Sequence, residues 1–233
     1  MIEAEWWDYD DVEEMAEAVA GDVGFIIESA LDARGSCLLA LPGGRTPKPI
    51  FARLAEARIP WKKVTIIPTD DRLVPMDSDQ SNIRSIAQTF LKAGARVVPI
   101  AADIADHKLA GNSADARLQD LSWPPDLCWL GIGEDGHVAS IFTGPDLQDA
   151  LDAPKARRAV GVMPDPMPAD APVARVTLTR ASILASRTIL FTITGKKKRE
   201  LLERAIADGQ SSGLPVGRVL AEAEQPIDIH WAP

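Results

Sequence analysis

The chain has 233 residues, of which 46% are hydrophobic and 25% are charged. This size and composition suit a single globular α/β domain over residues 1–233 and argue against a disordered chain. The formal net charge of -9 repels nucleic acid and anionic membranes, so a phosphate group would have to bind in a local basic pocket.

The acidic amino terminus shows no secretory signal, and every apolar run is too short to cross a bilayer, so a cytoplasmic location is expected. Cys37 and Cys128 lie in separate apolar segments and are expected to be free thiols.

Helical and strand patterns alternate along the chain. The first pattern predicts a helix over residues 11–31, which Gly21 or Gly24 could interrupt. Strands are predicted at 36–41, 64–68, 97–100, 126–130 and 188–194, helices at 47–57, 81–91 and 196–208, and extended segments at 159–163 and 175–178. Continuous apolar strands separated by helices indicate a parallel sheet with helices on both faces. The proline-rich residues 164–172 are expected to form a loop or a substrate-side crossover.

Polar sequences follow three of the predicted strands, at the edge where open parallel sheets bind ligands. The first is Pro42-Gly-Gly-Arg-Thr-Pro47, in which Gly43 and Gly44 let an anion approach the backbone. Thr46 is expected to cap the following helix, whose free N–H groups would suit a phosphate. A plain tight turn is the alternative, and the missing Gly-Lys-Ser/Thr ending argues against ATP.

The second polar sequence, Asp70-Asp71-Arg72, follows the strand predicted at 64–68. Its acids could hold substrate hydroxyls, and the planar guanidinium of Arg72 suits an anionic oxygen. The alternative is a solvated turn closed by a surface ion pair. Ser81 and Asn82 are expected to cap the next helix.

The third polar sequence, Gly131-Ile-Gly-Glu-Asp-Gly-His137, follows the strand predicted at 126–130. Its glycines match the dinucleotide fingerprint, but no strand ending in an acidic residue follows about twenty positions on, so that reading is disfavoured. The glycines instead predict a tight turn that presents His137 at a helix amino terminus, beside Asp135. Histidine suits proton transfer near neutral pH, and a structural histidine is the alternative.

Three other patterns carry less weight. Residues 209–213 match Gly-x-Ser-x-Gly, but they end a predicted helix rather than join a strand to one. His107 and His230 lie far from His137 in sequence, so a zinc site has little support. The basic residues 196–199 begin a helix, where the dipole disfavours cations; a bound phosphate would explain this placement, and a solvated patch is the alternative.

Together these segments resemble the 6-phosphogluconolactonase family, which is related to the glucosamine-6-phosphate deaminases. The resemblance covers about residues 41–202 and rests on six ordered motifs, at 42–47, 70–75, 81–82, 131–142, 175–179 and 194–198. It implies a Rossmann-like three-layer α/β sandwich with a mainly parallel sheet. The implied activity is hydrolysis of 6-phosphogluconolactone to 6-phosphogluconate in the pentose phosphate pathway, without metal or cofactor.

The resemblance also implies roles for individual residues. His137 would be the general base that activates water, Arg72 the positive group near the lactone, and Asp70 the acid that orients it. Arg72 or backbone N–H groups near Gly136 would hold the oxyanion. The substrate contacts implied are Gly43, Gly44, Arg45, Thr46, Asp135, Gly136, Arg175 and Lys198, with Arg175 and Lys198 on the phosphate side.

Three departures from related sequences bear on these expectations. Asp71 stands where the family usually has glutamate, and residues 164–172 lack a lysine that the family often carries there. Phe142 replaces a glutamate of the deaminases, which disfavours deamination because a phenyl ring cannot relay protons. A non-catalytic sugar-phosphate sensor and a dinucleotide-dependent oxidoreductase remain as alternatives. The expected partner is a small phosphorylated lactone, while the oligomeric state and the roles of Trp6 and Trp7 stay open.

Overall fold

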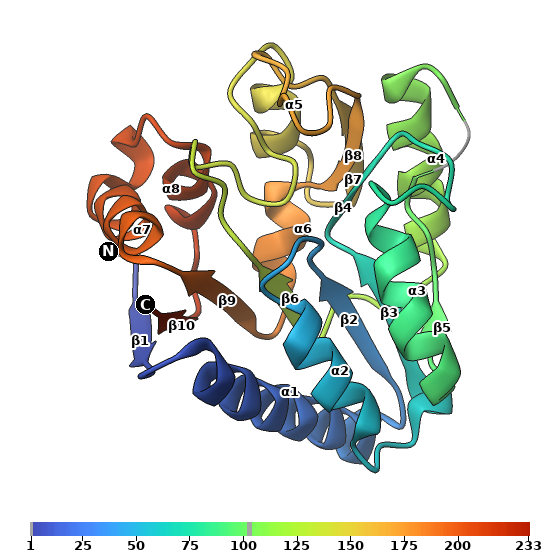
Figure 1. Ribbon diagram of the computed structural model, residues 1–233. Coiled ribbons are helices and arrows are strands. Elements are labelled where there is room, and N and C mark those ends of the chain that lie inside the picture. The colour runs from blue at the N-terminus through green and yellow to red at the C-terminus, as the bar shows by residue number, and fades with distance from the viewer. Residues whose placement is uncertain (1, 102–103) are drawn as a thin grey trace.

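A seven-stranded sheet lies at the centre of the computed structural model, which describes residues 2–101 and 104–233 (Figure 1). In spatial order its strands are β1 (Ala4–Asp8), β10 (Ile227–Ala232), β9 (Ile189–Thr194), β6 (Leu127–Leu130), β2 (Cys37–Leu41), β3 (Val64–Pro68) and β5 (Arg96–Val97). All neighbouring strands are parallel. The chain moves outward from β2 through β3 to β5 on one side and through β6, β9 and β10 on the other. The junction of β2 and β6 is therefore the point where the strand order reverses.

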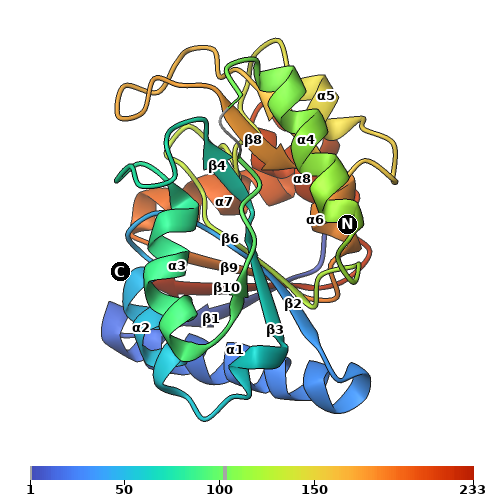
Figure 2. The ribbon, with the colours of Figure 1, turned by 90° about the vertical axis from the view of Figure 1, so that its right-hand side faces the viewer.

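Helices cover both faces of this sheet, which gives three layers (Figures 1 and 2). One face carries α1 (Val12–Arg34), α2 (Lys48–Glu56), α3 (Asn82–Ala93) and the short 3-10 helix η1 (Trp61–Lys63). The other carries α4 (His107–Gln119), α5 (Leu147–Leu151), α6 (Arg180–Ala185), α7 (Lys196–Asp208), η2 (Gly209–Ser211) and α8 (Pro215–Leu220). Successive strand residues alternate between the faces, so Leu38 belongs to one apolar core and Leu39 to the other.

A second, three-stranded sheet is antiparallel and has the order β4 (Asp70–Arg72), β8 (Arg175–Leu178), β7 (Ala159–Val162). The sequence predicted the extended segments at 159–163 and 175–178, but it assigned Asp70–Arg72 to a loop. The chain passes from one sheet to the other at Thr69. The Thr69 N–H donates to the Leu41 carbonyl of the large sheet at 2.9 Å, and its carbonyl accepts from Leu178 N of the small sheet at 2.9 Å.

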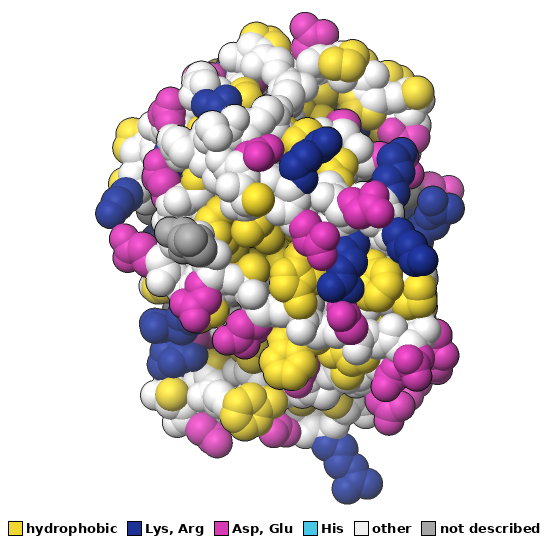
Figure 3. All heavy atoms as spheres, turned by 90° about the vertical axis from the view of Figure 1, so that its left-hand side faces the viewer, with side chains coloured by type: hydrophobic (Ala, Val, Ile, Leu, Met, Phe, Trp, Pro, Cys, Tyr) yellow, Lys and Arg dark blue, Asp and Glu magenta, His cyan; other side chains and the backbone are white. Residues whose placement is uncertain are grey.

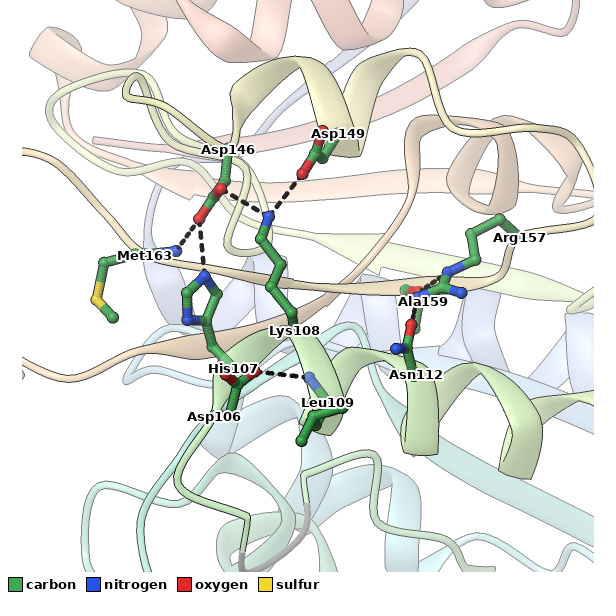
Figure 4. Close-up of polar contacts among 10 residues, drawn as sticks. All are labelled: Asp106, His107, Lys108, Leu109, Asn112, Asp146, Asp149, Arg157, Ala159 and Met163. Atoms are coloured by element: carbon green, nitrogen blue, oxygen red, sulfur yellow. Dashed lines mark hydrogen bonds and ion pairs between the residues drawn. The ribbon is translucent and has the colours of Figure 1, made fainter.

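Helix α4 packs on β7 at close range because a glycine lies on each side of the contact. A Cβ atom on Gly111 would lie 2.0 Å from the backbone nitrogen of Gly161, and a Cβ on Gly161 would lie 1.6 Å from the carbonyl oxygen of His107. Beside this contact, Asp146 lies 3.2 Å from His107 Nε2 and accepts a hydrogen bond from Lys108 Nζ at 2.7 Å (Figure 4). His107 therefore has a structural partner at the start of α4.

The predicted α/β fold with a mainly parallel sheet is confirmed, and several element boundaries differ. Helix α1 continues through Gly21 and Gly24, and nothing lies within 4 Å of a Cβ placed on either. The strand expected at 97–100 comprises only Arg96–Val97. The sequence did not predict β1, β10, α4, α6 or α8, nor α5, whose residues 147–150 lie in a stretch expected to be turn-like.

The described residues also show the state of the cysteines, the length and polarity of the helices, and the distribution of charge on one side of the surface. Cys37 and Cys128 are free and buried, as predicted, and burial raises the pKa of both thiols. No helix in the described ranges is long and apolar enough to cross a membrane. On the side of the molecule shown in Figure 3, acidic, basic and apolar side chains are interspersed.

Candidate active site

The carboxyl ends of β9, β6, β2 and β3, which are neighbours in the sheet, surround one pocket of about 300 Å³. It lies where the strand order reverses, the usual ligand site of such sheets. Nine of the eleven residues expected at the site line it, namely Gly43, Gly44, Arg45, Thr46, Asp70, Arg72, His137, Arg175 and Lys198. Asp135 and Gly136 lie behind His137 and do not line the pocket.

His137 projects from the loop after β6 and has three close neighbours. Its Nδ1 lies 2.5 Å from Asp135 Oδ1, and its ring stacks on Phe142 with centroids 4.1 Å apart. Burial opposes ionisation of Asp135, but the hydrogen bond and charge of His137 outweigh burial and lower the pKa of this carboxyl. Gly133 leaves room for the imidazole, since a Cβ there would lie 2.1 Å from Nδ1. The loop therefore holds the ring on three sides.

The expectation that His137 begins a helix is wrong. The segment contains only isolated bridges, between Ile132 and Val138 and between Val138 and Ile141, and the next helix begins at Leu147. Val138 and Ile141 are fully buried. Their burial draws the loop onto the core as a chain of turns, so no helix forms.

Gly136 has a structural role in this loop. Its φ of 80° favours glycine, and a Cβ would come within 2.9 Å of Leu214. Its N–H donates to the Gly133 carbonyl at 3.0 Å, while the His137 N–H points to Asp135 Oδ1 at 3.2 Å. Both N–H groups are thus engaged, so the expectation that they hold an oxyanion is not supported.

Arg72 and Arg175 face each other across the β4–β8 ladder. Arg72 Nη1 donates to the Gln80 carbonyl at 2.9 Å and to Asn82 Oδ1 at 3.0 Å, whereas its buried Nε has no partner among residues 2–101 and 104–233. Arg175 donates to the backbone carbonyls of Val173 and Ala171, at 3.3 and 2.9 Å. Within the described residues neither guanidinium has a carboxylate oxygen within 4.0 Å. Burial and the neighbouring Arg72 lower the pKa of Arg175, so an anion bound here would favour its charged form.

The adjacent acids Asp70 and Asp71 have different environments. Asp71 is fully buried, and its carboxylate accepts from the backbone N–H groups of Arg72, Asn82 and Ile83 at 2.9, 2.7 and 3.0 Å. Burial raises the pKa of Asp71, and these three hydrogen bonds only partly offset that effect. The aspartate at position 71 therefore supports the start of α3, and the departure from glutamate does not touch the pocket.

Asp70 lines the pocket. It was expected to orient Arg72, but its carboxylate hydrogen-bonds other residues instead. Its carboxylate accepts from Ser140 Oγ at 2.5 Å and from Thr69 Oγ1 at 3.1 Å. Thus the acid is held by two hydroxyl groups, and Arg72 is oriented by Asn82 instead. Asn82 also donates from Nδ2 to the Asp70 carbonyl at 2.8 Å.

The loop at residues 42–47 borders the pocket and leans on Asn82. A Cβ on Gly43 would lie 1.9 Å from Asn82 Oδ1, and Gly44 has a φ of 93°. The expected Thr46 cap is absent, since α2 has Pro47 as its N-cap and no side-chain cap. A turn closed by the Lys48 N–H and the Arg45 carbonyl, at 3.3 Å, places Thr46 before the helix. Ser81 does cap α3, as predicted, by accepting from a backbone N–H at 3.4 Å.

The basic residues that begin α7 point to different partners. Lys198 lines the pocket, whereas Lys197 pairs with Glu134 at 2.8 Å outside it. The guanidinium carbon of Arg199 lies 4.9 Å from the centre of the Trp6 ring. This contact gives one of the two amino-terminal tryptophans a packing role. A single lysine of this segment therefore faces the candidate ligand.

Some pocket residues, such as Thr192 on β9, were not expected at the site. Asn82 was expected only to cap a helix, and Pro168 and Asp170 come from the proline-rich loop. That loop forms one wall of the pocket even without the lysine usual in related sequences. Among residues 2–101 and 104–233, no group of three or more histidine, cysteine, aspartate or glutamate side chains could hold a metal ion.

The fold and the pocket define an α/β protein with a histidine–carboxylate pair and several basic side chains at the point where the strand order of the sheet reverses. Residues 10–231 match the family Glucosamine-6-phosphate isomerases/6-phosphogluconolactonase, and the chain belongs to this family. It is 38% identical over 223 residues to the 6-phosphogluconolactonase of Rhizobium meliloti, covering 94% of each chain. With the 6-phosphogluconolactonase of Pseudomonas aeruginosa it shares 34% identity over 224 residues, covering 94% of this chain and 91% of the relative.

Solved structures agree with this assignment. The crystal structure of a 6-phosphogluconolactonase from Shewanella baltica superposes with a TM-score of 0.91 at 28% identity, covering 99% of this chain and 98% of the other. The 6-phosphogluconolactonase of Thermotoga maritima gives a TM-score of 0.83 at 27% identity, covering 99% and 100%. The resemblance seen in the sequence is therefore confirmed.

Proposed function

We propose that this protein hydrolyses 6-phospho-D-glucono-1,5-lactone to 6-phospho-D-gluconate, a step of the pentose phosphate pathway. The observation that carries the proposal is a pocket in which His137, paired with Asp135, lies among arginines that have no carboxylate oxygen within 4.0 Å in the described part of the chain. A phosphorylated lactone needs both a base for water and positive groups for its anionic oxygens. The 6-phosphogluconolactonase relatives support this choice of substrate.

His137 is the proposed general base. Asp135 accepts a hydrogen bond from Nδ1, which leaves Nε2 free to take a proton. As Nε2 removes a proton from water, the water oxygen bonds to the lactone carbonyl carbon and an oxyanion forms. Collapse of this intermediate breaks the bond to the ring oxygen, which receives the same proton from His137.

Arg72 is the proposed oxyanion donor. Arg72 lines the pocket, and its Nη1 donates to Asn82 Oδ1 at 3.0 Å, which holds the guanidinium in place. A donor placed in this way stabilises the developing charge by about 3 kcal/mol. This assignment replaces the backbone N–H groups near Gly136, which are already engaged.

The phosphate is proposed to bind between Arg175, Lys198 and the loop formed by residues 43–46. Lys198 and Arg45 add positive charge to the lining, although the whole chain carries a charge of -9. Anchoring the phosphate fixes the lactone ring within reach of the base. The proposed partner is thus a small sugar phosphate in the cytoplasm, rather than nucleic acid or a membrane, and the chain would act as one domain.

The decisive experiment is a hydrolysis assay with freshly generated 6-phosphoglucono-δ-lactone. We expect His137→Asn to lose nearly all activity while its fold is retained, because asparagine cannot accept the proton. His107→Asn is the matched control, since His107 pairs with Asp146 outside the pocket. Near-normal turnover by His137→Asn would remove the proposed base.

The same assay separates the alternatives. Binding of 6-phosphogluconate by a parent protein that does not hydrolyse the lactone would indicate a sugar-phosphate sensor. Equal activity on unphosphorylated gluconolactone would contradict the phosphate site. Deamination is disfavoured because the side chain stacked on His137 is Phe142, which has no group to relay a proton.

A further inference from the structure

A buried polar cluster joins the His137 loop to the small antiparallel sheet. Ser140 is fully buried, and its hydroxyl donates to Asp70 Oδ2 on β4 at 2.5 Å. Its backbone N–H donates to Thr177 Oγ1 on β8 at 3.2 Å. One serine of the loop thus binds two neighbouring strands.

The loop needs such anchors because it has little regular structure of its own. In the described structure, the β-pairing of residues 131–142 is limited to two isolated bridges, and Ala139 has a φ of 50°. The left-handed conformation is unfavourable for alanine, so the surroundings must hold it in place. Burial of Val138 and Ile141 is non-directional, whereas the two hydrogen bonds of Ser140 fix both position and orientation.

The register of the small sheet connects this anchor to the pocket. Asp70 pairs with Thr177, and the next pair on the same face is Arg72 with Arg175. The rungs are two residues apart, about 7 Å along the strands. The Asp70–Thr177 pair therefore binds Ser140, while the Arg72–Arg175 pair presents both guanidinium groups to the pocket.

On the loop side, Ser140 lies between the two aromatic groups of the site. His137 is three residues before it, and Phe142 is two residues after it. Phe142 stacks on the His137 ring and lies 5.5 Å from the guanidinium carbon of Arg175. Any shift of Ser140 along the ladder would move the imidazole relative to the arginines.

We propose that Ser140 is a positioning residue for the lactonase reaction: acting through Asp70 and Thr177, it sets the distance between the His137 base and the guanidinium groups of Arg72 and Arg175. The inference rests on the function proposed above. It also gives Asp70 a role other than orienting Arg72, namely that of the acceptor which fixes the loop.

The test measures kcat and KM for 6-phosphoglucono-δ-lactone in Ser140→Ala. We expect kcat to fall by about 10- to 100-fold, because a displacement of about 1 Å is enough for such a loss. KM should change by less than about threefold, since the proposed phosphate contacts do not involve this anchor. The control is Ser186→Ala, another buried serine, whose hydroxyl donates to the Ser182 carbonyl at 3.3 Å outside the pocket. It should lower Tm by less than Ser140→Ala does, because its acceptor is uncharged, and it should keep the parental kcat.

A double-mutant cycle tests the route through Asp70. If Ser140 acts through this carboxylate, Ser140→Ala combined with Asp70→Ala should have the kcat of Asp70→Ala alone. Thr177→Val removes the acceptor of the Ser140 N–H, together with the hydrogen bond from Thr177 Oγ1 to the Leu178 carbonyl at 3.1 Å, and should lower kcat by a smaller factor. This variant decides the matter should Ser140→Ala not fold.

The outcomes are distinguishable. An inactive parent would overturn the proposed function, and the role of Ser140 with it. An active parent with unchanged kcat in both Ser140→Ala and Thr177→Val would overturn the role of Ser140 alone. Fully additive losses in the double variant would also contradict the inference.

Discussion

The contact between Gly133 and the imidazole of His137 gives the sharpest prediction of the proposed mechanism. In Gly133→Ala the new Cβ would lie 2.1 Å from Nδ1 and 2.2 Å from Cε1 of His137. Ordinary contacts begin at 3.4 Å, so the ring must move by about 1.3 Å. The same Cβ would lie 2.6 Å from Asp135 Oδ1, so the pair that orients the base is disturbed as well. A displacement of this size costs about 100-fold in kcat, or about 2.7 kcal/mol of activation free energy.

The assay is steady-state hydrolysis of the phosphorylated lactone, with Tm measured in parallel. KM should stay within about threefold of the parent, because Arg175 and Lys198 are not displaced. Gly213→Ala is the matched control: nothing lies within 4 Å of its added Cβ and Gly213 does not line the pocket, so kcat should be retained. Parental turnover in Gly133→Ala, or equal losses in both variants, would refute the idea that room for the imidazole is the function of Gly133.

Three further predictions concern pH, an aromatic ring and a lysine. Burial lowers the pKa of His230 to about 4, so as the pH falls from about 6.5 the unfolded chain binds a proton that the folded one does not. Urea unfolding should therefore show a loss of about 2–3 kcal/mol between about pH 7.5 and 4.5 that is absent in His230→Gln. Phe142→Leu, which removes the ring shared by the base and a guanidinium, should lower kcat about tenfold and raise KM, and unchanged constants would contradict the stacking role. Lys198→Ala should raise KM about tenfold at constant kcat, whereas Lys197→Ala should leave both constants unchanged.

The central sheet could be predicted because its strands are continuous apolar runs between helical patterns. β2, β3, β6 and β9 differ from the expected ranges by at most one residue at either end. Parallel strands also bring their carboxyl ends to one edge, which is why most of the expected residues line a single pocket. At that level, sequence motifs and chain topology sufficed.

The contacts that organise the pocket could not be predicted in the same way. Asp70 binds Ser140, 70 residues away, and no local pattern identifies such a partner. β4 is three residues long and exists only because β8 lies beside it. Likewise, Trp7 had no assignment from the sequence, and in the structure it stacks near His230 with 49% of its surface exposed.

The opposed arginines of the small sheet explain why Asp70 is held by hydroxyl groups. Like charges directly across an antiparallel ladder destabilise it, and a carboxylate between Arg72 and Arg175 would relieve that repulsion. Asp70 belongs to the neighbouring pair on the same face of the ladder, yet it accepts hydrogen bonds from Ser140 and Thr69 instead. Were Asp70 to bridge the arginines, an anionic substrate would have to compete with it for both guanidinium groups. The hydrogen bond from Ser140 therefore fixes the His137 loop and also keeps the arginines available to the substrate.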